Sequence, residues 1–306
     1  MTSRFPLTDL RDSQPRFFQT IPVDQIEVAA GITLLRERGV RGTDLQLALI
    51  VEHCGQHALT IDLAGGYIKE YGNGNPATPL DLGTAQELQA EAEQEPDDSK
   101  RAVQIQSRRF ARIAQRYREA MLHSDEAALA LLERICLFRL SVDCETLGAI
   151  FTGPAAKKVS GEALSILDPV QLQKKLDWLV YMRIVEANQS ETPSSAIQTR
   201  YMVHPAVRDG FLNGISRETK HASHEAIRHN FEVSLGDAAR KKPSDPATLD
   251  KLEEIIHHAL ATRNVRFAWS IYENRLGGMQ EYHRDVARLP SRYPSDQFDF
   301  GCCQAR

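Results

Sequence analysis

The chain has 306 residues, of which 42% are hydrophobic and 25% charged, and its formal net charge is −4. These ordinary globular values exclude a wholly disordered, collagenous or coiled-coil protein, and the length corresponds to about two domains. The small net charge gives no overall attraction to nucleic acid or to an anionic membrane.

The two ends of the sequence lack the features of a finished fold. Residues 1–7 read as the end of a strand that leads into a loop, because neither a helix cap nor a preceding strand is present. Residues 299–306 follow a helical region without any periodic pattern. We therefore expect the chain to be a fragment of a longer protein.

Residues 1–75 are predicted to form a helical domain, with a three-helix bundle over residues 22–71. Glycines mark the breaks between helices at Gly39 and Gly55. The helical spacing of apolar residues predicts the faces that point into the core. These residues are Ile26, Ala29, Ala30, Thr33 and Leu34, then Leu45, Leu49 and Ile50, then Leu59, Ile61, Leu63, Tyr67 and Ile68.

An acidic segment and a basic segment follow. Residues 76–100 are predicted to be an acidic linker, and residues 100–122 a basic amphipathic helix with Val103, Phe110, Ile113 and Tyr117 inward. The basic face is either a patch for nucleic acid or phosphate, or a solvated face that pairs with the acidic residues beside it. We favour pairing, because adjacent blocks of opposite charge usually neutralise each other.

Residues 101–215 are predicted to form a winged helix-turn-helix domain. Short helices over residues 125–151 precede a helix over 169–182, which begins after Asp168 with proline at its first position. Two short strands, 183–187 and 197–203, then flank a polar loop. Helices followed by such a hairpin are typical of a winged helix with a two-stranded wing.

The remaining chain, residues 216–306, is predicted to be a truncated helical repeat region. A helix at 205–214 ends the preceding domain, and helices are expected here at 217–236, 247–262, 264–276 and 279–289. Residues 247–276 form the pattern of a tetratricopeptide-type hairpin, with a turn at Arg263–Asn264 and with Ala268 and Tyr272 on the second helix. The overall fold class is therefore mostly α.

Most motifs of catalytic or metal chemistry are absent. The sequence has no GxxxxGK[ST], GxSxG, HExxH, CxxC or GxGxxG motif, and no apolar run near the roughly 18 residues of a membrane span. Five cysteines without a framework spacing predict reduced thiols in a cytoplasmic protein. We expect no bound metal and no catalytic residue. The remaining histidines are expected to be solvated or structural: His53, His221, His224, His229, His257 and His258.

Four motifs occur in an order that resembles the STAND-class NTPases, the NB-ARC or apoptosome-type group. They are Thr-Ser-Arg with Pro-Leu at residues 2–7, Gly-Gln-His-Ala-Leu at 55–59, the winged-helix pattern at 123–204, and Tyr-Met-Val-His-Pro at 201–205. The resemblance covers roughly residues 1–290.

The resemblance implies a role for four residues in binding ADP or ATP. Arg4 matches the arginine that senses the γ-phosphate. Gly55 and His57 match a Gly-x-Pro motif that contacts adenine, with histidine in place of proline. His204 matches the histidine of a Met-His-Asp motif that contacts the β-phosphate, with Pro205 in place of the aspartate. Alternatively, His204 caps the helix predicted over residues 205–214, with Pro205 at its first position. The family's P-loop subdomain would lie before Met1.

The resemblance implies a regulatory fragment of a nucleotide-switched signalling protein, which does not hydrolyse nucleotide by itself. Protein partners or a second copy would bind through the helical repeats, and no membrane is expected. One alternative is a winged-helix DNA-binding regulator with Lys174 and Lys175 reaching phosphates. Against it, the predicted wing tip carries no Arg or Lys, so we expect no nucleic-acid partner. A second alternative is a helical-repeat protein-binding scaffold.

Overall fold

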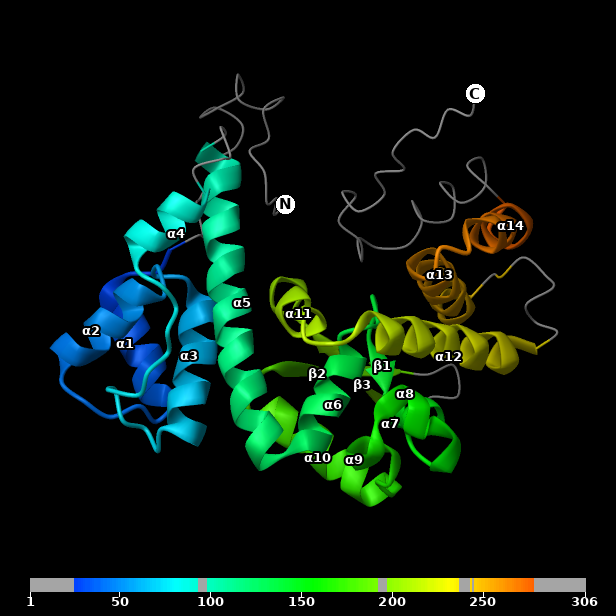
Figure 1. Ribbon diagram of the computed structural model, residues 1–306, viewed down its shortest axis with the longest axis horizontal. Coiled ribbons are helices and arrows are strands. Elements are labelled where there is room, and N and C mark those ends of the chain that lie inside the picture. Colours follow the sequence, from blue (N-terminus) through cyan, green and yellow to red (C-terminus); the bar gives the residue numbers. More distant parts are fainter. Residues whose placement is uncertain (1–24, 93–97, 192–196, 237–242, 244, 278–306) are drawn as a thin grey trace. The chain divides into compact units, whose positions relative to one another are not determined.

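The computed structural model describes residues 25–92, 98–191, 197–236, 243 and 245–277 (Figure 1). These residues are mostly helical and include a small three-stranded antiparallel sheet, which confirms the predicted mostly-α class. Among the described residues, no helix is both long enough and apolar enough to cross a membrane. The chain divides into two compact units, residues 1–223 and residues 224–306.

Three helices open the first unit, as predicted: α1 (Val28–Glu37), α2 (Asp44–His53) and α3 (Ala58–Tyr71). Thr43 and Gln46 form a capping box at the start of α2, which satisfies backbone N–H groups that the helix itself cannot pair. The three helices bury a common apolar core. Its fully buried members include Leu35, Leu47, Val51, Ile61 and Ile68.

The buried faces of α1 and α2 differ from the prediction. Leu45 and Leu49, expected inside, are 74% and 51% exposed, whereas Leu47 and Val51 are fully buried. The sequence of α2 is apolar on several sides, so its spacing could not single out the buried face. A Cβ on Gly31 would lie 2.7 Å from the Val51 side chain, which shows how closely α1 approaches α2. Other residues predicted inward but exposed are Ala29, Ala30 and Thr33, while Leu59 is half-buried.

Part of the predicted acidic linker is helical. Helix α4 (Ala85–Ala92) lies inside the linker range 76–100. Glu87 accepts a hydrogen bond from the Thr84 backbone N–H at 3.0 Å, and the Thr84 hydroxyl accepts one from the Glu87 backbone N–H at 3.2 Å. This reciprocal pair is a capping box, and it explains why a polar segment starts a helix here.

The long helix α5 (Asp98–Ser124) carries the predicted basic face. Phe110, Ile113 and Tyr117 are buried as predicted, but Val103 is 52% exposed. Ion pairs link the basic face to the acidic segment, which confirms the interpretation that we favoured. These pairs are Arg116 with Asp81 at 3.0 Å and Arg112 with Glu87 at 3.8 Å.

The rest of the first unit surrounds the sheet. Its elements are α6 (Glu126–Ile135), β1 (Val142–Asp143), α7 (Cys144–Phe151), the 3-10 helix η2 (Pro154–Ala156), α8 (Lys157–Ser160), α9 (Glu162–Ser165), α10 (Pro169–Tyr181), β2 (Val185–Glu191), β3 (Ile197–Val203) and α11 (Pro205–Leu212). The strand order is β1-β3-β2, with Val142 opposite Tyr201 and Val185 opposite Val203. The prediction of two strands therefore missed β1, which is two residues long.

Helix α12 (Arg217–Leu235) runs across the division between the units, and α13 (Pro246–Ala261) and α14 (Val265–Arg275) follow. Helices α13 and α14 form the predicted hairpin. Arg263 adopts a positive φ of 62° at the turn, and Ala268 is only 3% exposed. The helix predicted at 279–289 lies outside the described residues.

Candidate functional site

The residues predicted to contact nucleotide lie in two separate connections between elements of the first unit. Gly55 and His57 lie in the turn between α2 and α3, and His204 lies between β3 and α11. Arg4 lies outside the described residues.

Gly55 lies just after the end of α2, and its lack of a side chain leaves room for the Arg109 guanidinium. Its φ is +65°, and a Cβ at this position would collide with the guanidinium of Arg109 on α5. The adjacent Cys54 is buried, which raises the pKa of its thiol to about 12, and the positive charge of Arg109 opposes that rise. The structure gives Gly55 a role in packing, and its contact with adenine stays a prediction.

His57 stands at the first turn of α3 and contacts α5. Its ring packs edge-on against Phe110 with the centroids 5.4 Å apart. Its Nδ1 lies 3.5 Å from the hydroxyl of the fully buried Thr60, to which Gln106 donates a hydrogen bond. His57 is therefore positioned by α5 as well as by its own helix.

His204 caps α11 with its side chain. Its Nδ1 accepts a hydrogen bond from the backbone N–H of Ala206 at 3.2 Å. Because Nδ1 is the acceptor, the ring proton of a neutral imidazole must reside on Nε2. The cap thus fixes the tautomer, with Nδ1 as the acceptor and the ring proton on Nε2.

Helix α5 lies between these two connections, with α3 on one side and α11 on the other (Figure 1). Tyr117 on α5 donates a 2.8 Å hydrogen bond to the Leu63 carbonyl of α3. On the other side, a Cβ on Gly210 of α11 would lie 2.7 Å from the Ala114 Cβ. Helix α5 therefore packs against both α3, which follows His57, and α11, which follows His204.

A further link joins the three-helix bundle to the end of α10. Arg38 forms a bidentate pair with Asp62, with N–O distances of 2.6 and 2.7 Å. The same guanidinium donates to the Met182 carbonyl at 3.3 Å, and Arg183 adds a 3.3 Å contact to Asp62. This cluster is a structural connection between the two parts of the first unit.

The buried charges around α6 also have a structural role. Glu133 lies 3.2 Å from Arg118 and 3.4 Å from Arg134, and Arg134 donates two hydrogen bonds to the Val159 carbonyl. Burial raises the pKa of Glu133 and lowers that of Arg134, while their mutual attraction opposes both changes. Because each group has charged or carbonyl partners, the cluster gives no sign of a reactive group.

The polar residues of α10 are largely committed to internal contacts. Lys175, one of the two lysines assigned to phosphates in the DNA-binding alternative, forms a 2.5 Å ion pair with Asp125. Gln173 donates to the Tyr201 hydroxyl at 2.8 Å and to Asp177 at 2.7 Å. These contacts reduce the number of side chains that α10 could offer to DNA.

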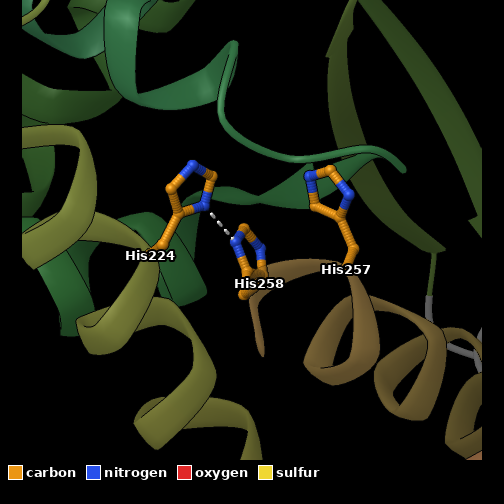
Figure 2. A group of neighbouring side chains, drawn as sticks. All are labelled: His224, His257 and His258. Atoms are coloured by element: carbon orange, nitrogen blue, oxygen red, sulfur yellow. Dashed lines mark hydrogen bonds between the residues drawn. The ribbon is translucent and has the colours of Figure 1, made fainter. Parts of the chain in front are cut away.

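Three histidines meet in the second unit, and Figure 2 shows their rings gathered between α12 and α13. His224 Nδ1 and His258 Nδ1 are 2.7 Å apart, and the ring centroids of His257 and His258 are 5.1 Å apart. The expectation that His224 is simply solvated was wrong, because its side chain is half-buried against His258. The sequence could not reveal this contact between residues on separate helices.

A buried carboxylate adjoins this histidine cluster. Glu254, one turn before His258 on α13, places Oε2 3.1 Å from His258 Nε2. The ring N–H is not aligned on that oxygen as a hydrogen bond requires, so we treat this as an electrostatic contact. Both side chains are almost fully buried, at 0% and 4% exposed.

Comparison with models of known protein families gave no match to this sequence, and a search of curated proteins gave no significant match.

Proposed function

We propose that this chain is the regulatory part of a nucleotide-switched signalling protein of the STAND type. The observation that carries the proposal is the position of His204, which directly follows the β2–β3 hairpin and caps α11 through Nδ1. In this proposal the β-phosphate of the nucleotide accepts a hydrogen bond from His204 Nε2, while Nδ1 stays bonded to the first turn of α11.

The element order around the sheet supports a winged-helix interpretation of this region. Helix α6 is followed by the short strand β1, then by α7 to α10, and then by the hairpin of β2 and β3. Strand β1 pairs with β3 and completes a three-stranded sheet, as expected of a winged helix. In this interpretation His204 is the residue that directly follows the wing.

The proposed switch works through α11 and α5. A hydrogen bond from an imidazole to a phosphate contributes roughly 1–3 kcal/mol, which biases a two-state equilibrium about tenfold or more. Movement of His204 would carry α11 with it, because the side chain is bonded into the first turn of that helix. Helix α5 would then transmit the movement toward His57, since its Phe110 contacts that ring.

A comparison of ADP with AMP tests the proposed contact. We expect the chain, joined to the P-loop region that this proposal places upstream of it, to bind ADP more tightly than AMP, because only ADP offers a β-phosphate to His204. The variant His204→Gln should lose this difference, whereas His123→Gln on an exposed position of α5 should keep it. Isothermal titration or ring NMR shifts would measure the two affinities. Equal affinities in the parent chain, or an unchanged difference in His204→Gln, would contradict the proposal.

The gene itself offers a second test. We expect the DNA upstream of the Met1 codon to encode, in frame, a strand, a GxxxxGK[ST] loop and a helix, because this proposal assigns the P-loop to that region. A stop codon or unrelated sequence there would leave the nucleotide role without its main binding element.

A second candidate function is protein binding through α14. Val265 and Trp269 are 60% and 52% exposed on this helix, one turn apart, and Trp269 lies 5.7 Å from the ring of Tyr272. Such an exposed stripe supports stacking of a further helical hairpin, a partner or a second copy. If so, Trp269→Ala should weaken self-association or partner capture without lowering the unfolding midpoint, as light scattering and thermal denaturation would reveal.

A further inference from the structure

We propose that His224, His257 and His258 form a binding site for a divalent transition-metal ion of the zinc type. The site lies wholly within the second unit and is independent of the nucleotide role proposed for the first. It also goes against the expectation from the sequence that the chain binds no metal.

The spacing of the imidazole nitrogens is close to what a metal ion needs. One ring nitrogen from each histidine lies within 4.8 Å of the others. Zinc binds histidine nitrogens at about 2.0–2.1 Å in a tetrahedral arrangement, which places neighbouring ligand nitrogens roughly 3.3–3.4 Å apart. The 2.7 Å between His224 Nδ1 and His258 Nδ1 would open slightly, and the His257 ring would turn inward. Small ring rotations can supply both changes.

The helices that carry the ligands are held by their own packing. Ile227 on α12 and Ile255 and Ala259 on α13 are all 1% exposed or less. Arg228 on α12 lies 5.1 Å from the centre of the Phe267 ring on α14. Helix α14 in turn packs against α13, so α12 is tied to α13 through α14 and the three rings are gathered before an ion arrives.

Glu254 places a carboxylate next to the His258 ring nitrogen that would not bind the ion. Histidine ligands commonly donate their second ring N–H to a carboxylate, which fixes the tautomer and makes the ligating nitrogen more basic. Glu254 Oε2 lies 3.1 Å from His258 Nε2, so a carboxylate there favours a proton on Nε2, and the ring rotation that accompanies ion binding would align Nε2–H with that oxygen. His258 Nδ1 then presents its lone pair toward His224, where the ion would lie. The buried negative charge of Glu254 also offsets part of the charge of the ion.

The ligand set selects the class of metal. Three imidazoles favour zinc, cobalt, nickel or copper over magnesium and calcium, which prefer oxygen ligands. His224 and His257 are only half-buried, so an ion can enter from solvent. Three protein ligands leave a fourth position for water, as in zinc sites that are not closed by a fourth side chain.

Titration of the full chain, without a histidine tag, with Co²⁺ tests the site. We expect saturable binding of one ion per chain, with the visible absorption of four-coordinate cobalt and no band from thiolate ligands. Zn²⁺ should displace the cobalt. His257→Gln and His224→Gln should each weaken binding more than about 100-fold, and Glu254→Gln about 10- to 100-fold, as when other carboxylates that support metal-bound histidines are replaced.

The double variant His221→Gln/His229→Gln is the matched control, because both residues are exposed on α12 outside the cluster. It should bind Co²⁺ like the parent chain. His258 is fully buried, so its replacement could unfold the unit. The half-buried His257 and His224 therefore decide the result, with circular dichroism confirming that each variant folds. Absence of binding, a thiolate band, or equal affinities of the parent chain and His257→Gln would overturn the proposal and leave a hydrogen-bonded histidine pair.

Discussion

Gly148 and Gly210 both lie inside helices, but only Gly148 has room for an added methyl group. A Cβ on Gly210 would lie 2.7 Å from the Ala114 Cβ and 3.4 Å from the Ala111 backbone, neither of which can move aside easily. A Cβ on Gly148 would meet its nearest neighbour, the Leu172 side chain, at an ordinary 3.5 Å. The same substitution should therefore have opposite effects at the two positions.

We predict that Gly210→Ala lowers the free energy of unfolding by about 1–3 kcal/mol through overpacking. Gly148→Ala, its matched control, should raise it by about 0.5–1 kcal/mol, because alanine loses less backbone entropy in a helix. Urea denaturation of the two variants would measure both effects. A stabilised Gly210→Ala would mean that α11 does not pack on α5 as closely as described.

The pKa of Glu133 gives a prediction with a definite sign. Burial raises this pKa above its ordinary value of 4.5 in the folded chain, so the folded state holds the proton more tightly than the unfolded state. The stability that this group contributes is therefore greatest below about pH 4.5 and is lost as the pH rises through the raised value. Glu133→Gln, which cannot ionise, should remove this fall.

The test is the difference in unfolding free energy between the parent chain and Glu133→Gln at a series of pH values. We expect the parent chain to lose stability relative to the variant as the pH rises above 4.5. The opposite slope would mean that the ion pairs with Arg118 and Arg134 outweigh the cost of burial.

At the scale of whole elements, helix caps explain where several helices begin. Asp168 accepts a 2.8 Å hydrogen bond from the Gln171 backbone N–H, and the Gln171 side chain accepts one from the Asp168 backbone N–H at 3.0 Å. We predict that Asp168→Ala destabilises the chain by about 0.5–2 kcal/mol. Glu27 stands at the same position of α1 without a side-chain cap, so Glu27→Ala should be near neutral in the same denaturation assay.

Elements with strong local signals could be predicted from the sequence, and weaker ones could not. Asp168 and Pro169 identify the start of α10, and alternation of polar and apolar segments identifies the β2–β3 hairpin. The capping box at Thr84 and Glu87 carries the signal for α4, although the acidic composition around it suggested a linker. Strand β1 is too short to show any periodicity.

The candidate sites depend on contacts that no local pattern encodes. His224 and His258 lie on different helices, and only folding brings their Nδ1 atoms to 2.7 Å. The one local sign was the spacing of Glu254 and His258, which places them one turn apart on the same helix. In contrast, the position of His204 after the hairpin followed directly from the sequence, and the structure confirms the cap that the sequence offered as an alternative role.

At the scale of the whole molecule, the labelling of two cysteines can show whether the first unit unfolds in a single cooperative step. Cys54 in the three-helix bundle and Cys136 after α6 are both buried, which raises the pKa of each thiol and slows its reaction with labelling reagents. Helix α5 contacts both regions, through Tyr117 to Leu63 and through Arg118 to Glu133. We therefore expect the two thiols to become reactive together.

A Cys144→Ser/Cys302→Ser/Cys303→Ser background leaves these two thiols for measurement. In increasing urea, labelling followed by mass spectrometry should give equal rates at Cys54 and Cys136. Faster labelling at Cys54 would mean that the bundle opens independently of the sheet region, and α5 would then not join them into one cooperative body.

Helix α5 also limits how this sequence can change in length over evolution. Its 27 residues form a rod about 40 Å long, and the residues from Phe110 to Arg118 meet neighbours on several sides. A single inserted or deleted residue within that stretch would rotate everything beyond it by about 100° and turn Tyr117 away from α3. Natural relatives should therefore keep this spacing unchanged and confine insertions to exposed loops outside α5.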